Sequence, residues 1–270
     1  MGFTAKQWTE EVHMKHENAQ QYRTASAHQT TWGMALVRSL ALTGEEHVLD
    51  LGCGDGRVTD AIAAEVPFGS VIGVDISPAQ IAAANKRVRE NCTFRCMDLK
   101  SISWVGSFDI IVSNASLHWV DGHEELLSRV YRALRPGGRV FLNFAAEGNS
   151  ANFIEAVKEA MRDPAYAPYF SDFRWPWYMP SRDEYAPIAA RVPFSDITVA
   201  SEDAEAAFPN ANAIESWIDM PSIIPFVHRV PPDRRVYFRN DVARGVLMRT
   251  RQNDGRYRER FRRIAVYARK

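Results

Sequence analysis

Cysteine is scarce in this sequence, and the three that occur are Cys53, Cys92 and Cys96. An odd set of cysteines without a C-x-x-C pair forms no disulfide framework and lacks the spacing of a zinc site. We therefore expect free thiols, no metal site and a reducing compartment, the cytoplasm.

Excess charge and long apolar runs are also missing. Lys plus Arg and Asp plus Glu number 33 each, so the net charge is zero, and no global field favours nucleic acid or an anionic membrane. No segment approaches the roughly 18 consecutive apolar residues of a membrane span. We expect a soluble protein with neither nucleic-acid nor membrane partners, and its oligomeric state is left open.

From residue 47 onward, short apolar runs alternate with helical patterns. The first strand candidates are HVLDL, SVIGVDI, CTFRCMD, FDIIVSN and RVFLNF. This alternation is typical of βαβ units and a parallel sheet, so the fold class is α/β. We expect three parts: an N-terminal helical cover (1–44), an α/β core (45–147) and a cap or substrate region (148–270) that also carries the last strands, near DITVAS and RIAVYAR.

Two helix starts have a chemical signal. Ser77 is followed by a proline and then a glutamine, and Asp121 is followed three residues later by Glu124. A short polar residue with Glu or Gln three positions on is typical of a capping box. We therefore expect Ser77 and Asp121 to cap the helices that follow them.

The stretch VLDLGCGDGRV, residues 48–58, predicts a ligand-binding loop between a strand and a helix. Its glycines are Gly52, Gly54 and Gly56, a G-x-G-x-G pattern, whereas a dinucleotide fold requires G-x-G-x-x-G and has Arg57 in its last position here. Asp75 ends the next strand, 19 residues after Gly56, where a carboxylate can accept hydrogen bonds from ribose hydroxyls. The pattern favours a nucleoside without requiring a pyrophosphate.

These motifs together resemble the class I S-adenosylmethionine (SAM)-dependent methyltransferases. VLDLGCGDG, GVDIS, CMD at 96–98, FDIIVSNASLHWV and LRPGGRV stand in that family's order and at its spacings over roughly residues 45–145. The resemblance implies a Rossmann-like, doubly wound, mostly parallel sheet of seven strands, with an N-terminal helical cover and C-terminal cap elements. It also implies SAM as methyl donor, S-adenosylhomocysteine as product, and no metal.

The resemblance assigns cofactor contacts to residues of these motifs and of the N-terminal segment. They are Tyr22, Asp50, Gly52, Cys53, Gly54, Asp75, Ile76, Met97, Asp98, Leu99, Asn114 and Ala115. Asp75 would hold the ribose, Met97 and Asp98 would flank the adenine, and Asn114 and Ala115 would line the sulfonium side.

Other members of this set have a structural alternative beside the functional one. Asp50, with the glycine loop, would lie beside the methionine moiety, or else cap a strand end. Asp98 would otherwise be a turn residue, and the ordered motifs favour the functional interpretation of both aspartates. For Cys53, loop filler is the better interpretation, and Tyr22 would close over the cofactor.

The acceptor side resembles the branch of juvenile hormone acid and trans-aconitate methyltransferases, which esterify carboxylic acids. ENAQQYRTASAHQ, SNASLHWV and DGRYRERFRRIAVYARK are similar to that branch. The resemblance implies that Gln29 and Trp119 orient the acceptor carboxylate through neutral N–H donors; their alternatives are a helix-surface residue and a core aromatic. An ionised carboxylate needs no general base, so His118, which strand alternation could point away from Trp119, is a secondary catalytic candidate.

Two later segments bear on the acceptor. Residues 163–180 contain four prolines and seven aromatic residues, which fits a cap over the substrate as well as a loop tucked against the core. The arginine-rich stretch Arg229–Arg263 fits a second carboxylate of the acceptor, although a solvated helix face is the commoner arrangement.

We therefore expect a SAM-dependent O-methyltransferase that converts the carboxylate of a small organic acid to a methyl ester. The alternatives are a C- or N-methyltransferase acting on a non-carboxylate acceptor, and a non-catalytic SAM-binding protein.

Overall fold

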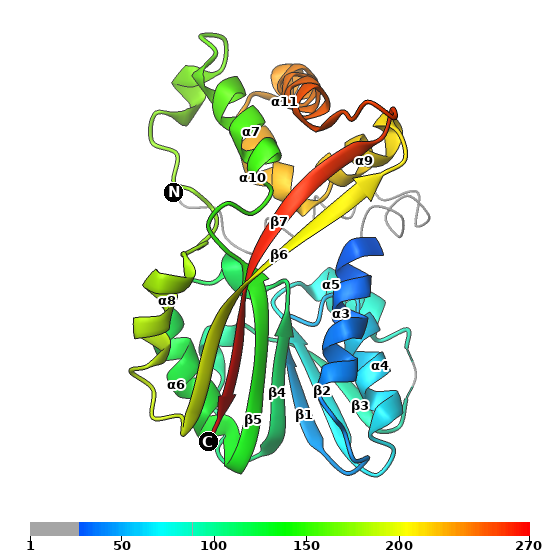
Figure 1. Ribbon diagram of the computed structural model, residues 1–270, viewed down its shortest axis with the longest axis vertical. Coiled ribbons are helices and arrows are strands. Elements are labelled where there is room, and N and C mark those ends of the chain that lie inside the picture. The colour runs from blue at the N-terminus through cyan, green and yellow to red at the C-terminus, as the bar shows by residue number, and fades with distance from the viewer. Residues whose placement is uncertain (1–26, 88) are drawn as a thin grey trace.

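The computed structural model describes residues 27–87 and 89–270, and a seven-stranded sheet runs through this part of the chain (Figure 1). The strands are β1 (His47–Leu51), β2 (Ser70–Asp75), β3 (Cys92–Cys96), β4 (Phe108–Asn114), β5 (Leu134–Ala145), β6 (Asp196–Phe208) and β7 (Tyr257–Arg269). Their order is β3-β2-β1-β4-β5-β7-β6. β1 to β5 are parallel, and β7 is antiparallel to both β5 and β6. The predicted α/β class with a mostly parallel sheet is confirmed.

Helices cover both faces of the parallel part of the sheet. They are α3 (Ala27–Ser39), α4 (Arg57–Glu65), α5 (Pro78–Ala84), α6 (His123–Ala133) and α8 (Arg182–Ala189). Val48 and Ile110 pack in one cluster with α3 and α4, whereas their strand neighbours Leu49 and Ile111 pack in another with α6 and α8. Successive side chains in a strand point to opposite faces. Burial on both faces therefore explains why these strands are almost continuously apolar.

A second group of helices covers the far halves of β6 and β7 (Figure 1). These cap helices are α7 (Ala151–Arg162), α9 (Ala211–Ile218), α10 (Ile224–Val227) and α11 (Arg235–Thr250). They share an apolar cluster that includes Phe153, Trp217, Phe238 and Phe261. None of the helices within 27–87 and 89–270 is long and apolar enough to cross a membrane.

β6 and β7 take part in both apolar cores, and they do so with opposite faces. In β7, Phe261 packs under the cap helices, whereas Ile264 packs in the core with α6 and α8. In β6, Ala206 packs under the cap helices and Val199 packs against the core with α6 and α8. In β7 the buried face changes at Arg263, so this residue lies where the cap meets the sheet.

One of the two predicted helix caps is present. Ser77 Oγ accepts a hydrogen bond from the backbone N–H three residues on, at 3.2 Å. The capping box predicted at Asp121 and Glu124 is wrong. α6 instead begins after Gly122, whose φ of 72° lies in the left-handed region, and the Asp121 carboxylate pairs with Lys100. A glycine in that conformation starts the helix without a side-chain cap.

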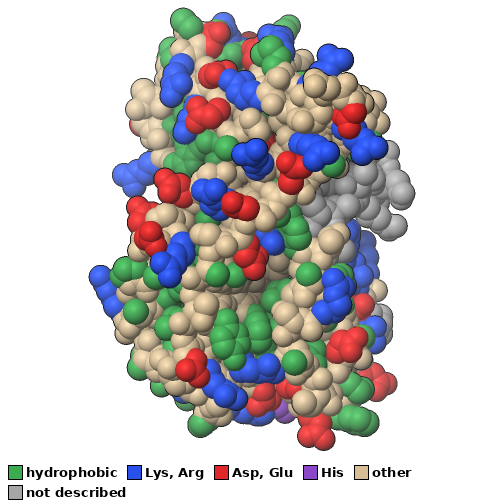
Figure 2. All heavy atoms as spheres, in the orientation of Figure 1, with side chains coloured by type: hydrophobic (Ala, Val, Ile, Leu, Met, Phe, Trp, Pro, Cys, Tyr) green, Lys and Arg blue, Asp and Glu red, His purple; other side chains and the backbone are tan. Residues whose placement is uncertain are grey.

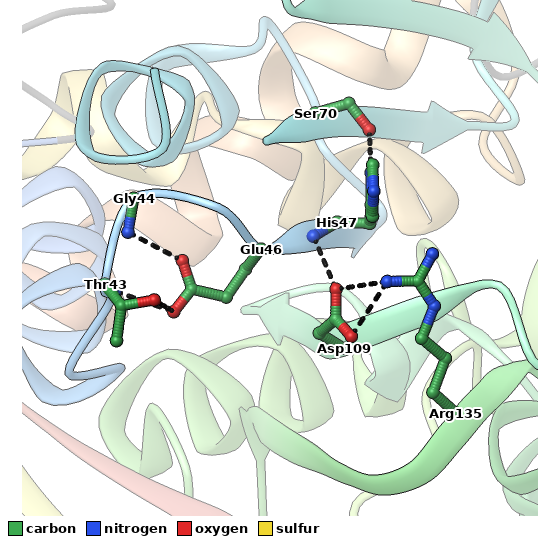
Figure 3. A network of polar contacts seen from close by, with 7 residues as sticks. All are labelled: Thr43, Gly44, Glu46, His47, Ser70, Asp109 and Arg135. Atoms are coloured by element: carbon green, nitrogen blue, oxygen red, sulfur yellow. Dashed lines mark hydrogen bonds and ion pairs between the residues drawn. The ribbon is translucent and has the colours of Figure 1, made fainter. Parts of the chain in front are cut away.

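Polar contacts fasten the edge of the sheet where β1, β2 and β4 begin (Figure 3). The Asp109 carboxylate accepts hydrogen bonds from the His47 backbone N–H at 2.8 Å and from Arg135 Nη1 at 2.8 and 3.0 Å. His47 Nδ1 lies 2.6 Å from Ser70 Oγ. Burial alone would raise the pKa of Glu46, but hydrogen bonds from the preceding turn hold it below its ordinary value. In open α/β sheets, ligands bind at the carboxyl ends of the strands. We therefore look for ligand-binding residues at the opposite end of the strands from these contacts.

Candidate active site

The glycine loop lies between β1 and α4 and is tied to the end of β2. The backbone N–H groups of Gly52 and Cys53 both donate to the Val74 carbonyl, at 2.8 and 3.0 Å. The Cys53 side chain is 8% exposed, and burial raises the pKa of its thiol far above the ordinary range. A protonated, enclosed thiol fits the loop-filler interpretation of Cys53.

Gly52 and Gly54 share a backbone conformation but differ in the space around them. Gly52 and Gly54 have φ values of 75° and 55°, in the left-handed region that glycine adopts without strain. A Cβ added to Gly52 would lie 1.8 Å from Ser116 Oγ, whereas a Cβ on Gly54 would meet no described atom within 4 Å. Gly52 is therefore required for packing within the protein, and Gly54 leaves open space beside the loop.

Asp75 brings the end of β2 and the loop together. Its Oδ2 accepts a hydrogen bond from the Gly54 N–H at 2.9 Å, and its Oδ1 accepts one from Ser77 N–H at 2.9 Å. Burial raises the pKa of the carboxyl, and the two hydrogen bonds act against that rise. The Asp75 carbonyl also accepts from Met97 N–H at 2.9 Å, so the end of β3 lies beside it. The resemblance assigns Asp75, Gly54 and Met97 to the same cofactor, and in the structure the three residues are linked through these hydrogen bonds.

Ile76, Leu99 and Asp98, which the resemblance also assigns to the cofactor, differ in burial and in their contacts. Ile76 is an exposed apolar side chain beside Asp75, at 45% of its accessible area. Leu99 is buried in the core between the sheet and α6. Asp98 Oδ1 accepts a hydrogen bond from the Lys100 N–H and so caps the turn that follows β3.

Asp50 is a buried carboxyl at the end of β1, 2% exposed. Its Oδ2 accepts a hydrogen bond from Thr59 Oγ1 at 2.7 Å. Burial, assisted by the nearby Asp75 charge, raises its pKa to about 6, although the Thr59 hydrogen bond acts against that rise. An ionised carboxylate here would be stabilised by a cation close to the loop.

At the end of β4 the backbone is strained. Ala115 has a φ of 55°, unusual for a residue with a side chain. Its N–H donates to the Asn143 carbonyl of β5 at 2.7 Å, which holds this conformation. A Cβ on Gly33 of α3 would lie 3.3 Å from Asn114 Nδ2, so the N-terminal helix closely approaches this strand end. Asn114 and Ala115 thus lie beside the glycine loop, since Ser116 abuts Gly52.

The structure does not describe the side chains of two predicted residues. Tyr22 lies among residues 1–26, and Gln29 belongs to α3 but its side chain is outside what the structure describes. Their assignments stay predictions.

A hollow of about 590 Å³, including its open mouth, lies between Ala115 and the cap helices. Its wall carries polar groups from His118, Asn149, Ser150, Trp177, Ser222 and Arg263. The rest of the wall is apolar and includes the rings of Trp32, Phe153, Trp217 and Phe261. Among the described residues of the wall there is no aspartate or glutamate. The predicted sulfonium side and this hollow therefore meet at Ala115.

His118 lines the hollow, and it is neutral. Its Nδ1 lies 3.5 Å from the Ala145 N–H and accepts from it, and burial lowers the pKa of the imidazole to about 3. Strand alternation does not apply to His118 and Trp119, because Leu117–Trp119 is a 3₁₀ turn. The Trp119 ring lies 5.4 Å from His118 and packs edge-on against Trp177 at 5.5 Å.

The aromatic segment 163–180 belongs to the cap and reaches the hollow. Phe170 and Trp177 are buried in the cap cluster, and Trp177 and Met179 both line the hollow. The Tyr178 N–H donates to the His118 carbonyl at 2.9 Å, which ties the segment to the turn that carries His118. The segment thus forms one side of the hollow.

The arginine-rich stretch divides into two kinds of residue. Most charges on the face shown in Figure 2 are interspersed by sign, and Arg239 pairs with Glu215 and Asp219, at 2.9 and 2.8 Å. Arg263 differs, because its side chain is only 13% exposed and lines the hollow. Sequence patterning had favoured a solvated helix face for the whole stretch, and Arg263 lies on a strand.

Glu259, which the sequence analysis did not single out, holds the start of α7 against β7. Glu259 of β7 is fully buried, and its carboxylate accepts hydrogen bonds from Phe153 N–H at 3.1 Å and from Asn152 Nδ2 at 3.0 Å. This fastens the start of α7 to β7. The signal for Glu259 is its place two residues before Phe261, on the strand face that the cap buries. Among the described residues no group of three or more His, Cys, Asp or Glu side chains is arranged to hold a metal ion.

Residues 48–138 match the family model of a methyltransferase domain. The trans-aconitate 2-methyltransferase of Deinococcus radiodurans is 31% identical over 205 residues, which cover 74% of this chain and 78% of the relative. A protein of the same name from Methylobacterium radiotolerans is 30% identical over 251 residues, covering 87% of this chain and 91% of the relative.

Solved structures share the fold at low sequence identity. The YcgJ protein of Bacillus subtilis superposes with a TM-score of 0.60 at 19% identity, covering 90% of this chain and 98% of that protein. Phosphoethanolamine N-methyltransferase 2 of Haemonchus contortus, solved with phosphomonomethylethanolamine and S-adenosylhomocysteine, has a TM-score of 0.59 at 17% identity, covering 98% of this chain and 61% of that chain. At such identities the likeness concerns the fold alone.

Proposed function

This chain belongs to the class I SAM-dependent methyltransferases, and we propose that it methylates the carboxylate of a small organic acid to give a methyl ester. The relatives named above are trans-aconitate 2-methyltransferases, which supports a carboxylic acid as the acceptor. The proposal also includes a cytoplasmic enzyme that uses neither metal, nucleic acid nor membrane, with residues 1–44, 45–147 and 148–270 as cover, core and cap region.

The wall of the hollow carries the proposal, because its described residues offer no effective proton acceptor at neutral pH. It has no carboxylate, and His118, with a pKa of about 3, is too weakly basic to take a proton from an amine or a phenol. A carboxylic acid is already ionised at that pH and has no proton to lose. A carboxylate is therefore the acceptor that this wall suits best.

The glycine loop and the buried Asp50 support SAM as the cofactor. When bound, SAM supplies a methyl group on a positively charged sulfur. The buried Asp50 carboxylate suits a nearby cation, and the space beside Gly54 admits a ligand close to the backbone. The assigned contacts, from ribose to sulfonium side, are Asp75, Ile76, Met97, Asp98, Leu99, Asp50, Gly52, Cys53, Gly54, Asn114, Ala115 and Tyr22.

The protein's part in the reaction is alignment. A carboxylate oxygen of the acceptor forms the bond to the methyl carbon while the carbon–sulfur bond breaks and its electron pair goes to sulfur. No proton moves, and the negative and positive charges cancel. Gln29 and Trp119 donate hydrogen bonds that hold the carboxylate in line, and His118 contributes a neutral polar wall beside them.

The identity of the product tests this function. We expect transfer of labelled methyl groups from SAM to one or more carboxylic acids, trans-aconitate among those offered, and release of the label as methanol in mild alkali. Each acid should be offered beside its amide, which lacks the carboxylate and should remain unlabelled. Transferred methyl groups that all resist mild alkali would mean transfer to nitrogen, carbon or an ether oxygen, and the proposal would be wrong.

The ribose assignment makes a separate prediction. Asp75→Ala should weaken the binding of S-adenosylhomocysteine about 10- to 100-fold, since it removes charge-assisted hydrogen bonds to the ribose. Calorimetry measures this without turnover. Asp60→Ala, which removes an aspartate of α4 that pairs with Arg89, serves as the control and should leave the affinity unchanged. An Asp75→Ala protein that binds normally would refute the assignment.

A further inference from the structure

His123 is a buried histidine that the proposed reaction does not use. It is the first residue of α6 and is 3% exposed, and its ring centre lies 4.8 Å from that of Tyr178 and 5.2 Å from that of Phe144. Burial lowers the pKa of the imidazole, so the ring is neutral at neutral pH and carries one proton. A neutral imidazole has one donor and one acceptor nitrogen, and in a buried site both need partners.

The partners of the two ring nitrogens fix which of them carries the proton. Nε2 of His123 lies 3.1 Å from the Leu117 carbonyl oxygen and 3.0 Å from the Val120 carbonyl oxygen. Carbonyl oxygens only accept, so the proton is on Nε2, which donates to both. Nδ1 is then the acceptor, and the hydroxyl of the fully buried Tyr185 donates to it at 3.1 Å. Tyr185 thus holds the tautomer in which His123 donates to these two carbonyls.

The two carbonyls flank His118, which lines the hollow, and Trp119, to which we assign the acceptor carboxylate. Leu117–Trp119 is a single 3₁₀ turn, and a turn of this kind has few hydrogen bonds of its own, with poor geometry. Bonds from outside must therefore hold it. The Tyr178 N–H donates to the His118 carbonyl at 2.9 Å, and His123 donates on either side of it. The turn is thus fastened to the aromatic segment and to α6.

We propose that His123 is a positioning residue of the acceptor side, because its Nε2–H fixes the turn from which Trp119 donates to the acceptor carboxylate. This inference rests on the proposed function, since it deepens the role given there to Trp119. His123 is not among the described residues that line the hollow, so it acts through the backbone of the turn. Displacing an aligning group by about 1 Å can cost on the order of 100-fold in rate.

Two amide variants separate the two hydrogen bonds of His123. The glutamine amide N–H reaches the position of Nε2 and can donate to the turn. The asparagine amide oxygen reaches the position of Nδ1 and can accept from Tyr185, but asparagine is too short to reach the turn. We expect His123→Asn to lower kcat/KM for the acid at least 10-fold and His123→Gln to remain within about 5-fold of the unaltered protein. An asparagine variant as active as the glutamine variant, or more active, would overturn the proposal.

Two further measurements distinguish positioning from general stability. S-adenosylhomocysteine affinity, measured by calorimetry, should stay within about 3-fold in both amide variants, because the glycine loop is not altered. Tyr185→Phe removes the hydroxyl bonded to Nδ1 and should lower the Tm, but it leaves Nε2 opposite the two carbonyls. Its kcat/KM should therefore remain within about 5-fold of the unaltered protein. Activity that instead falls in step with Tm across the three variants would show that His123 only stabilises the fold.

The tautomer itself can be measured in the unaltered protein, which keeps the proposal open to refutation if both amide variants fail to fold. Nitrogen NMR of the histidine side chains, with His123 assigned through its contacts to the Tyr185 ring, should show a proton on Nε2 and none on Nδ1. A protonated Nδ1 would leave the two carbonyls of the turn without this donor, and the proposal would be wrong.

The outcome is separable from that of the proposed function. If the protein methylates an amine or a phenol and no acid, the proposed function fails, and the same variants are compared with that acceptor. A larger loss in His123→Asn than in His123→Gln would then still support the positioning role. If acids are methylated but the two amide variants do not differ, the reaction stands and the role of His123 is refuted.

Discussion

Trp119→Phe is expected to lower kcat/KM for the acid substrate about 100-fold. Phenylalanine keeps an aromatic ring to pack against Trp177 but removes the indole N–H that we assign to the acceptor carboxylate. Loss of one orienting or stabilising hydrogen bond at a reacting group costs on the order of 100-fold in other enzymes. The binding of S-adenosylhomocysteine, measured by calorimetry, should remain within about 2-fold of that of the unaltered protein.

The pH dependence of kcat provides the matching control. Because the pKa of His118 is lowered to about 3, this side chain is neutral at pH 7 and above and does not change charge there. With both substrates saturating, kcat should be flat between about pH 7 and 9, and His118→Ala should cost less than 10-fold. A kcat that rises through this range and becomes flat in His118→Ala would identify His118 as a general base and remove the reason for a carboxylate acceptor.

Gly52→Ala is expected to destabilise the fold by about 3 kcal/mol or more. The residue has a left-handed φ of 75°, and its new Cβ would lie 1.8 Å from Ser116 Oγ and 2.3 Å from Ser116 Cβ. Backbone strain and overpacking each cost about 1–3 kcal/mol. Thermal unfolding without cofactor should show a lower Tm, by about 6 °C or more at this chain length.

Gly54→Ala is the matched variant, since it has the same backbone conformation without the clash. We expect it to lower the Tm by no more than a few degrees but to weaken S-adenosylhomocysteine binding, because the added methyl group occupies the space beside the loop. Adding Ser116→Gly to Gly52→Ala should restore part of the lost stability. Equal Tm values for the two glycine variants would contradict the packing role of Gly52.

The sequence predicted the parallel core well because local and tertiary signals agree there. Apolar runs flanked by helical patterns sufficed for β1 to β5. The central strands β1 and β4 are buried on both faces, whereas the edge strand β3 is partly exposed. The lengths of β6 and β7 were not predicted. Their buried face changes within the strand, at Arg263 in β7, and the outward positions are rich in arginine and glutamate. A single period-two pattern therefore does not run through either strand.

The candidate site divides in the same way. The resemblance assigned Asp75, Gly54 and Ala115 to one cofactor site, and the structure places all three where β2, β1 and β4 end. Arg263 reaches the hollow, and Glu259 reaches the start of α7, only because β7 returns between β5 and β6. A contact over so long a sequence separation leaves no local pattern. The prediction that Asp121 caps α6 failed for a local reason, because Gly122, in a left-handed conformation, occupies the N-cap position instead.

The position of β7 has a consequence for how the molecule comes to be folded during synthesis. β5 and β6 both precede β7 in the chain but do not pair with each other, since β7 lies between them. Until β7 has left the ribosome, both strands present open hydrogen-bonding edges, and the cap helices lack the side chains of β7 on which they pack. The nascent chain therefore exposes aggregation-prone strand edges until β7, which follows the other described strands in the sequence, has been made, and only then can β5, β7 and β6 pair and close the wall of the hollow.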